Sequence, residues 1–213
     1  IKGINLSICM HRVLLETYAK PVTEQQRKLN PVMKEILKLL ELGIIYPISD
    51  SEWVSLVHVV PKKIGITIVR NEKNELVSMR FQNSWKMCID FKNLNAATRK
   101  YHFPLPFIDK MLERLPGKCF FYVLDGYSGY YQISATQENK HKTTFTCPFE
   151  TFAYRRMPFG LYNAPGTFQR CMMSIFSDLM ENCIVLFMDD CTVYGNFFYQ
   201  RFHHLTKVLI DPG

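Results

Sequence analysis

The chain has 213 residues, of which 47% are hydrophobic and 16 are phenylalanine, so extensive disorder is excluded and one large domain or two subdomains sharing a core are expected. The formal net charge of +7 favours an anionic partner such as nucleic acid; the alternative is a basic soluble protein without one. No apolar stretch approaches the roughly 20 residues of a membrane helix and no secretory signal is visible, so we expect a protein that is neither membrane-bound nor secreted.

The seven cysteines are scattered along the chain without the CxxC spacing of a zinc site. This distribution indicates reduced thiols in an intracellular compartment rather than a disulfide framework. The adjacent pair His203-His204 has no cysteine or histidine partner at ligand spacing, so it does not indicate a zinc site either.

Residues 1–28 carry weak signals and are expected to form a partly ordered lead-in. A helix is predicted after Asn30 and Pro31, which supply a cap and a first-turn proline, and Gly43 is expected to end it. Residues 53–60 then form a β-prone segment.

The next stretch predicts a β-hairpin that projects into solvent. Its strands are residues 66–69 and 76–81, and they flank the polar residues 71–75. Residues 85–91 are expected to form a further strand. A second helix is predicted from Pro106 to Leu115, because apolar residues recur on one of its faces.

The last hundred residues continue to alternate between strands and helices. In chain order we expect a strand at 120–124, two short paired strands at 142–147 and 151–154, a long helix from Asn163, a hairpin at 187–194, and a short, poorly patterned tail from residue 196. This order of elements predicts an α+β fold with helices backing an antiparallel sheet.

Two adjacent carboxylates, Asp189 and Asp190, stand between two apolar, β-prone runs. The pattern predicts a tight hairpin with both charges at its tip, where they repel each other unless they are solvated or hold a cation. A surface turn is the alternative, because aspartate is common in turns. A third acid, Asp125, ends another strand-like run, and one sheet would bring all three together. Magnesium is the usual hard partner of carboxylates, and three acids suit a two-metal phosphoryl-transfer site.

Short motifs also follow one another in a specific order between residues 42 and 190. In chain order they are Leu42-Gly43-Ile44-Ile45, Val59-Val60-Pro61-Lys62-Lys63, Trp85-Lys86-Met87-Cys88-Ile89-Asp90-Phe91, Phe103-Pro104-Leu105-Pro106, Leu124-Asp125-Gly126-Tyr127-Ser128-Gly129-Tyr130, Arg156-Met157-Pro158-Phe159-Gly160-Leu161, Asn163-Ala164-Pro165 with Thr167-Phe168-Gln169, and Phe187-Met188-Asp189-Asp190. No single motif is decisive, but the ordered set resembles the reverse transcriptase of gypsy-class LTR retrotransposons, in its plant-type form.

The resemblance implies a right-hand polymerase made of fingers and palm, in which helices back an antiparallel palm sheet and the thumb is missing. It divides the chain into an N-terminal lead-in (1–28), a fingers-like subdomain (29–119), a palm subdomain with the catalytic acids (120–195) and a truncated tail (196–213). The implied activity is that of an RNA-directed DNA polymerase core, which extends a primer with deoxynucleotides by two-metal phosphoryl transfer.

By the same resemblance, Asp125, Asp189 and Asp190 would be both the catalytic residues and the metal ligands. They would hold two Mg²⁺ ions, with Mn²⁺ as an alternative cofactor. One ion would lower the pKa of the primer hydroxyl, and the other would clamp the triphosphate and the leaving pyrophosphate.

Three side chains are predicted to contact the incoming nucleotide. Tyr130 falls where the family places an aromatic ring beneath the sugar, which would exclude a ribose 2′-hydroxyl; an ordinary core tyrosine is the alternative. Lys86 stands where arginine is usual and would contact the phosphates without arginine's bidentate fork. Lys63 is a further phosphate-binding candidate, although a solvated lysine turn would explain it equally well.

The loop at Phe159 and Gly160 would approach the nascent base pair and the template, because glycine allows close backbone contact. Without the resemblance, these residues would be interpreted as a turn only. Met188, in the acid hairpin, completes the predicted substrate-binding set.

The implied partners are a primed RNA or DNA template, deoxynucleoside triphosphates and the remainder of a Pol polyprotein, namely thumb, ribonuclease H and integrase. The implied location is a reducing one: the cytoplasm, a virus-like particle or the nucleus. Two alternatives stay open. One is a catalytically silent nucleic-acid-binding remnant, favoured by the missing thumb, and the other is a magnesium-dependent phosphodiesterase that uses the same acids.

Four further positions depart from the family pattern. Leu56 replaces a proline, Ile64 replaces a glycine, and Val185 replaces an acidic residue. Gly166 replaces an alanine inside a helix, which we expect to destabilise that helix by about 1 kcal/mol.

Overall fold

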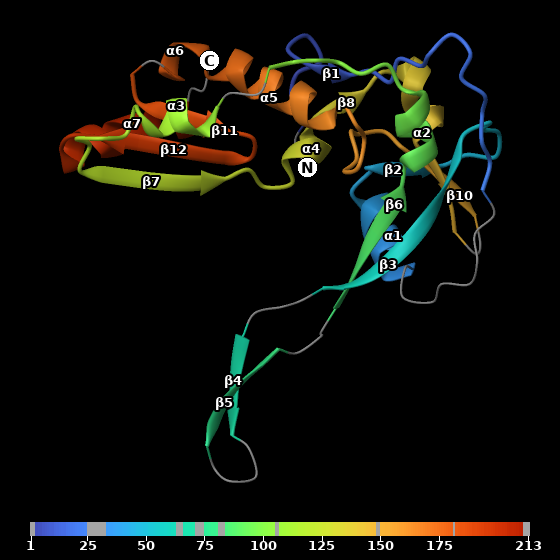
Figure 1. The fold of residues 1–213 in the computed structure, drawn as a ribbon, viewed down its shortest axis with the longest axis horizontal. Helices are drawn as coiled ribbons and strands as arrows, with labels where there is room; N and C mark the ends of the chain where they lie inside the picture. The colour runs from blue at the N-terminus through green and yellow to red at the C-terminus, as the bar shows by residue number, and fades with distance from the viewer. Residues whose placement is uncertain are drawn as a thin grey trace.

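The computed structural model describes residues 3–24, 33–62, 66–70, 75–80, 84–104, 107–147, 150–180 and 182–210. Two main sheets lie at opposite ends of the body, and a long hairpin projects from one of them (Figure 1). The fold is a mixed α+β fold, as the sequence predicted. No helix in the described part of the chain is both long and apolar enough to cross a membrane.

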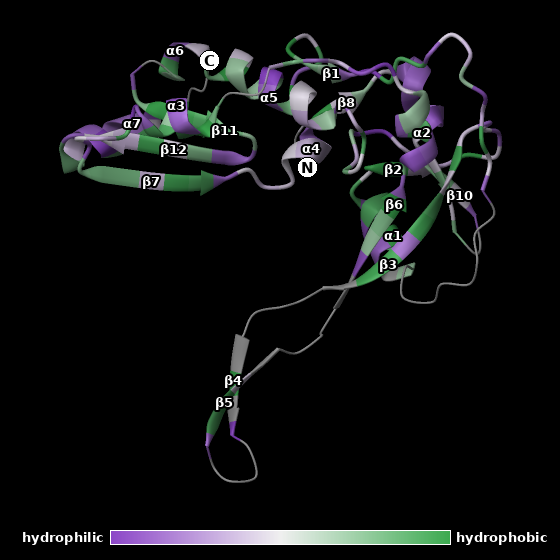
Figure 2. Ribbon diagram, viewed as in Figure 1, coloured by the Kyte–Doolittle hydropathy of each residue, from purple (hydrophilic) through white to green (hydrophobic). Residues whose placement is uncertain are grey.

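The smaller main sheet is antiparallel and has the central strand β12 between β11 and β7. Its strands are β7 (Phe120–Asp125), β11 (Ile184–Phe187) and β12 (Asp190–Gly195). Helices pack on its apolar face, and they are α5 (Ala164–Ile175), α6 (Ser177–Met180) and α7 (Phe198–Ile210). Figure 2 shows how apolar these three strands are. This is the predicted antiparallel sheet backed by helices.

The larger sheet has five strands in the order β2-β10-β9-β3-β6, antiparallel except for the parallel pair β3 and β9. Its strands are β2 (Ile45–Pro47), β3 (Val54–Lys62), β6 (Ser84–Asp90), β9 (Thr144–Thr146) and β10 (Thr151–Tyr154). The main core lies against this sheet, where Phe145 and Tyr154 are almost fully buried. The two-stranded hairpin of β4 (Ile66–Arg70) and β5 (Leu76–Arg80) extends beyond β3 and β6 (Figure 1).

The remaining elements are short. They are β1 (Met10–His11) paired with β8 (Ser134–Ala135), α1 (Met33–Glu41), α2 (Lys92–Ala97), α3 (Ile108–Leu112), α4 (Gly129–Gln132) and the 3₁₀ helix η1 (Gln137–Thr143). The helix that ends before Gly43 and the projecting hairpin are confirmed. Gly43 has a φ of 65°, which is the left-handed conformation typical of a residue just after a helix. The predicted helix start at Asn30 and Pro31 lies outside the described residues.

Two predicted elements differ from the structure. The predicted helix over 106–115 is only the short α3, which buries no side chain, and Pro106 lies outside the described residues. The tail from residue 196 is not poorly patterned, because it contains the 13-residue helix α7. Its periodicity is masked by apolar residues on both faces: Val208 is buried, whereas Phe202 and Tyr199 are exposed.

Two of the departures from the family pattern, Val185 and Gly166, fit their surroundings. Val185 is buried in β11, where an ionised acid would be costly. Leu56 lies in β3 opposite Asp90. A Cβ at Gly166 would lie 3.3 Å from Cβ of Phe103, so α5 approaches the preceding segment closely at this position. Ile64 lies outside the described residues.

Candidate active site

The hairpin between β11 and β12 turns on two residues, Met188 and Asp189, because Phe187 pairs directly with Asp190. Met188 has a φ of 53°. A positive φ at the first turn residue matches the twist of the flanking strands, but it costs a residue with a Cβ about 1–2 kcal/mol. The surrounding structure must therefore hold this turn in place.

Gln169 of α5 supplies that restraint. Its side chain is completely buried, and its Oε1 accepts a hydrogen bond from the backbone N–H of Met188 at 2.8 Å. Its Nε2 donates to the carbonyl of Leu186 at 3.4 Å. One helical side chain thus holds both the turn and the strand that leads into it. The sequence motif contains Gln169 but gives no sign of this role, because the contact joins distant parts of the chain.

The antiparallel register places the third acid beside the turn. Asp125 is the direct partner of Asp190 in the β7–β12 ladder. The backbone N–H of Gly126 donates to the carbonyl of Asp189 at 3.0 Å. The structure therefore brings the three predicted acids to one end of the smaller sheet, where Asp125 and Asp190 are exposed and Asp189 is half-buried.

The surroundings of Asp189 destabilise the ionised form of its carboxylate. Burial raises its pKa, and the neighbouring charges of Asp125 and Asp190 raise it further. Its Oδ1 atom is buried and has no hydrogen-bond partner among the described residues. Buried polar atoms are nearly always paired, so an orphaned carboxylate oxygen beside two further acids fits a position for a cation.

Side chains alone do not complete a metal site. Within the described residues, no group of three or more His, Cys, Asp or Glu side chains is arranged so that it could hold a metal ion. Mg²⁺ is usually held by one or two carboxylates together with substrate phosphates rather than by an all-protein cage. The donor chemistry of these acids therefore fits a divalent cation that substrate oxygens help to ligate.

Gly129 allows the acid hairpin to approach α4 and α5. A Cβ at this position would lie 2.7 Å from the ring of Phe168 and 3.0 Å from Oδ1 of Asp189. The preceding residue, Ser128, has a φ of 52°, so the chain turns sharply before α4 begins. Only glycine fits here without displacing the Phe168 ring or the Asp189 carboxylate.

Tyr130 lies between the acids and an aromatic cluster. Its ring centroid is 4.6 Å from that of Phe159 and 5.2 Å from that of Phe168. Burial raises the pKa of its hydroxyl, and the charge of Asp189 raises it further. The side chain is therefore both packed against the core and close to the catalytic candidates.

The loop that carries Phe159 and Gly160 is fixed by Asn95. The side-chain amide of Asn95 donates to the carbonyl of Gly160 at 2.8 Å, and its Oδ1 accepts from the N–H of Tyr162 at 2.8 Å. Gly160 has a φ of 96°, a conformation that favours glycine. Phe159 remains 47% exposed, so its ring is available to a ligand beside Tyr130.

Of the two lysines predicted to contact phosphates, the structure describes only Lys86, which is not part of this group. Lys86 is exposed on β6, which belongs to the larger sheet, and its backbone partner there is Val60. Lys63 lies outside the described residues. Met188 lies at the tip of the acid hairpin itself.

Known proteins are similar to this chain in sequence and in fold. Residues 69–210 match the family described as Reverse transcriptase (RNA-dependent DNA polymerase). The chain is 32% identical over 86% of its length to the Retrovirus-related Pol polyprotein from transposon 297 of Drosophila melanogaster, and it spans 16% of that polyprotein. It is 34% identical over 59% of its length to an RNA-directed DNA polymerase homolog of Oenothera berteroana, of which it covers 90%.

The fold is similar to that of the foamy viral protease-reverse transcriptase, solved in complex with an RNA/DNA hybrid. The TM-score is 0.73 at 18% identity, and the match covers 93% of this chain and 25% of the viral one. At this identity the similarity shows the fold alone. The chain thus has the fold of part of a polymerase.

Proposed function

We propose that this chain, which belongs to the reverse transcriptase (RNA-dependent DNA polymerase) family, carries the catalytic acids of an RNA-directed DNA polymerase. In this proposal, residues 29–119 act as fingers and residues 120–195 act as palm. The observation that supports it best is the pairing of Asp125 with Asp190 beside the buried Oδ1 of Asp189, which has no hydrogen-bond partner among the described residues. Neighbouring carboxylates of this kind suit a two-metal phosphoryl-transfer site.

Asp125, Asp189 and Asp190 would hold the divalent cations, Mg²⁺ or Mn²⁺. When bound, such ions lower the pKa of a primer hydroxyl and neutralise the charge of the triphosphate. The protein's own part is to hold the carboxylates in place. The ladder between β7 and β12 fixes Asp125 against Asp190, and Gln169 fixes the turn that carries Asp189.

Tyr130 and Phe159 would receive the nucleotide next to the acids. Their rings lie 4.6 Å apart between centroids, and Asp189 lies close enough to Tyr130 to raise the pKa of its hydroxyl. A rigid ring at this place would exclude a 2′-hydroxyl and so select deoxynucleotides. Phe159 and Gly160 would contact the template and the new base pair, Met188 would contact the substrate, and Lys86 and Lys63 would attract phosphates from the fingers.

The proposed ligands are a primer annealed to an RNA or DNA template and deoxynucleoside triphosphates. The net charge of +7 suits such anionic partners. A similar fold is found in a viral reverse transcriptase solved in complex with an RNA/DNA hybrid. The similarity to a Pol polyprotein favours further domains of that kind, such as thumb, ribonuclease H and integrase, as partners.

Primer extension on poly(rA)/oligo(dT) in the presence of Mg²⁺ tests the proposal. The wild-type chain is expected to incorporate deoxynucleotides, and Asp189→Asn is expected to lose this activity. Asp50→Asn removes one exposed acid outside the candidate site and should leave incorporation unchanged, so it is the matched control. Equal incorporation by wild type and Asp189→Asn, or duplex binding without any incorporation, would favour the catalytically silent remnant instead.

A further inference from the structure

Two buried thiols meet where the N-terminal segment crosses α5, apart from the acid hairpin. One belongs to Cys9, which directly precedes β1, and the other to Cys171 of α5. A hydrogen bond joins the two side chains, although they come from distant parts of the sequence. Neither thiol belongs to the candidate active site, so the contact calls for an explanation of its own.

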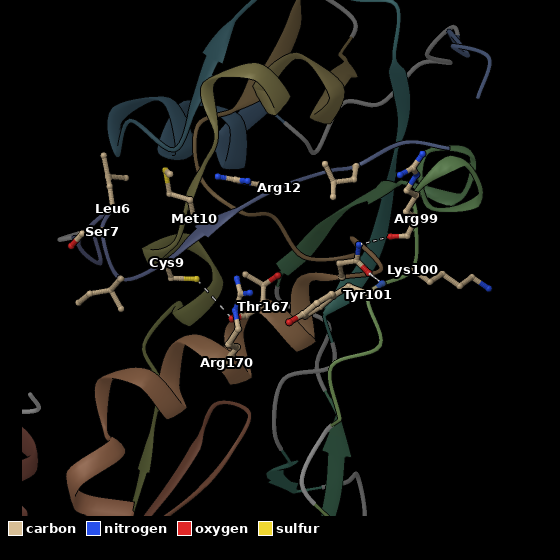
Figure 3. Close-up of a pocket in the computed structure, with 13 residues that line it drawn as sticks. Leu6, Ser7, Cys9, Met10, Arg12, Arg99, Lys100, Tyr101, Thr167 and Arg170 are labelled. Atoms are coloured by element: carbon tan, nitrogen blue, oxygen red, sulfur yellow. Dashed lines mark hydrogen bonds between the residues drawn. The ribbon is translucent and has the colours of Figure 1, made fainter. Parts of the chain in front are cut away.

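The geometry of α5 brings the two sulfurs together. The Sγ atom of Cys9 lies 3.9 Å from the carbonyl oxygen of Thr167, as Figure 3 shows. Cys171 follows Thr167 by one turn of the helix. Helical side chains lean toward the N-terminal end, so the side chain of Cys171 lies over the turn that carries this carbonyl. Both thiols therefore occupy the same turn of α5.

The segment that carries Cys9 is anchored on both sides of the thiol. The backbone N–H of Cys9 donates to the carbonyl of Asn5 at 3.3 Å, and β1 then pairs with β8. Nδ1 of His11 lies 3.4 Å from Oγ1 of Thr167. Because the thiols are already in contact, an S–S bond between them requires a small shift of side chains rather than unfolding of the segment.

The thiol of Cys9 can be reached from a cavity. This cavity has a volume of about 480 Å³ and lies between the N-terminal segment, the segment that follows α2 and the start of α5 (Figure 3). A water molecule takes up about 30 Å³, so a small oxidant such as hydrogen peroxide fits easily. Cys9 lines the cavity and Cys171 is not among its described lining residues, so a reagent there meets Cys9 first.

Charge distinguishes the two thiols. Arg12 and Arg170 line the cavity, and no Asp or Glu is among its described lining residues. The pKa of Cys9 is lowered, chiefly by the hydrogen bond with Cys171 and, against the opposing effect of burial, by the charge of Arg170. The pKa of Cys171 is raised, chiefly by the hydrogen bond with Cys9 and further by burial. Cys9 is therefore the better thiolate, and Cys171 remains the thiol that donates to it.

Other buried cysteines lack this arrangement. Burial raises the pKa of Cys147 to about 12, and burial together with the neighbouring Cys183 raises the pKa of Cys191 to about 11. Buried thiols that stay protonated are unreactive. A low-pKa thiolate that can be reached by an oxidant and lies beside a second thiol is typical of cysteines that sense peroxide.

We propose that Cys9 and Cys171 form a peroxide-sensitive site that closes as a disulfide between the N-terminal segment and α5. The Cys9 thiolate attacks one oxygen of hydrogen peroxide, the O–O bond breaks, and hydroxide leaves as the sulfenic acid forms. The sulfur of Cys171 then attacks that of Cys9, and its proton leaves with the sulfenic hydroxyl as water. The two thiols lose two electrons in all, which reduce the peroxide to water.

The disulfide would fasten the N-terminal segment to the helix whose Gln169 holds the acid hairpin. Its formation needs neither a metal ion nor a nucleotide, so the site is independent of the proposed function. Asp189→Asn should therefore form the disulfide at the wild-type rate, whatever the result of primer extension.

The test is peptide mapping of the native protein after treatment with stoichiometric hydrogen peroxide. Cys119→Ser serves as the background, because it removes an exposed thiol that would join two molecules. Remaining thiols are blocked with N-ethylmaleimide, and the protein is digested without reductant and analysed by mass spectrometry. A linked pair of peptides carrying Cys9 and Cys171 is expected, and dithiothreitol should separate it.

Two variants identify which thiol reacts first. Cys171→Ser should stop the reaction at the sulfenic acid of Cys9, which dimedone traps as a stable adduct. Cys9→Ser should give neither the linked peptides nor a dimedone adduct at Cys171. A dimedone adduct at Cys171 in place of Cys9 overturns the proposal. A linked pair that forms only after unfolding in urea also overturns it, because the native contact would then play no part.

The role of the cation is measured with two arginines of the cavity wall. Arg170→Gln should slow the formation of the disulfide about fivefold, because the Cys9 thiolate loses a neighbouring positive charge. Arg99→Gln removes the same charge from another part of the wall (Figure 3) and is the matched control, which should react at the wild-type rate. Circular dichroism before and after oxidation checks that each variant is folded.

Discussion

Asp125 lies directly opposite Asp190 across the β7–β12 ladder, and the residue after Asp125 donates its backbone N–H to the carbonyl of Asp189 at 3.0 Å. The positions of the three acids therefore depend on backbone pairing rather than on contacts between their own side chains. Substituting one carboxylate consequently changes the charge of the site while leaving its framework intact.

The first prediction concerns the charge of Asp189. Folding raises its pKa above the ordinary value of 3.8, so the native state favours the protonated form and loses stability as the pH rises from 3.8 through the raised pKa. Asp189→Asn is therefore expected to raise the Tm at pH 7 without metal by about 2 °C, a gain that disappears below pH 3.8. Thermal unfolding followed by circular dichroism at both pH values measures this.

Millimolar Mg²⁺ provides the complementary measurement. It should raise the Tm of the wild-type chain, because bound cations relieve the repulsion among the acids. It should raise the Tm of Asp189→Asn much less. An identical metal response in the two proteins would argue against a cation at Asp189.

The second prediction concerns Gln169. Gln169→Leu keeps the volume of the side chain but leaves the N–H of Met188 without its acceptor, at a cost of about 1–3 kcal/mol in the free energy of unfolding. Displacement of the turn is expected to lower the rate of primer extension about 100-fold. Gln137→Leu, at an exposed position of η1, is the control and should retain the wild-type rate.

The third prediction compares two glycines of one loop. Gly129→Ala places a Cβ 2.7 Å from the Phe168 ring, so we expect it to destabilise the fold by about 1–3 kcal/mol and to slow extension about tenfold or more. A Cβ at Gly126 would meet its nearest atom, the carbonyl oxygen of Asp189, at an ordinary 3.5 Å. Gly126→Ala should therefore have the smaller effect in both denaturant unfolding and extension, and the opposite order would contradict the packing described here.

The fourth prediction concerns selection of the sugar. Tyr130→Ala removes the ring beside Phe159 and should raise ribonucleotide incorporation relative to deoxynucleotide incorporation by about tenfold. Tyr130→Phe keeps the ring and should retain the discrimination. The ratio of kcat/KM values for the two nucleotide types measures this, and equal ratios in all three proteins would assign Tyr130 to the core alone.

The sequence predicted that Asp125, Asp189 and Asp190 lie together at one end of a sheet, because the local patterns that indicate strands are strong there. Asp125 and Asp189 each follow a β-prone run, and such runs pair in one sheet. The role of Gln169 could not be predicted from the sequence, because its side chain contacts the turn only after α5 packs on the sheet. Gly166 is a second example. The sequence predicted that a glycine there destabilises the helix, but it did not reveal the close contact with Phe103, which forms only in the folded structure and leaves room for a small residue alone.

The helix α7 was missed for a different reason. Its exposed face carries Phe198, Tyr199 and Phe202, so apolar residues do not mark a single buried stripe. The short α2 and α4 have too few turns for a periodic pattern to emerge. Here the chain's contacts with the rest of the fold, rather than its local preferences, decide the structure.

The strand order β11-β12-β7 leaves β7 with a single neighbour in the described part of the chain, and Phe121 and Val123 on that strand are exposed. A strand with one free edge and exposed apolar side chains can act as a template for self-association through intermolecular backbone hydrogen bonds, although Arg201 of α7 already donates to the carbonyl of Phe121. Purified alone at high concentration, this polypeptide should form β-paired aggregates. Val123→Lys would place a charge on this edge and should keep the protein monodisperse.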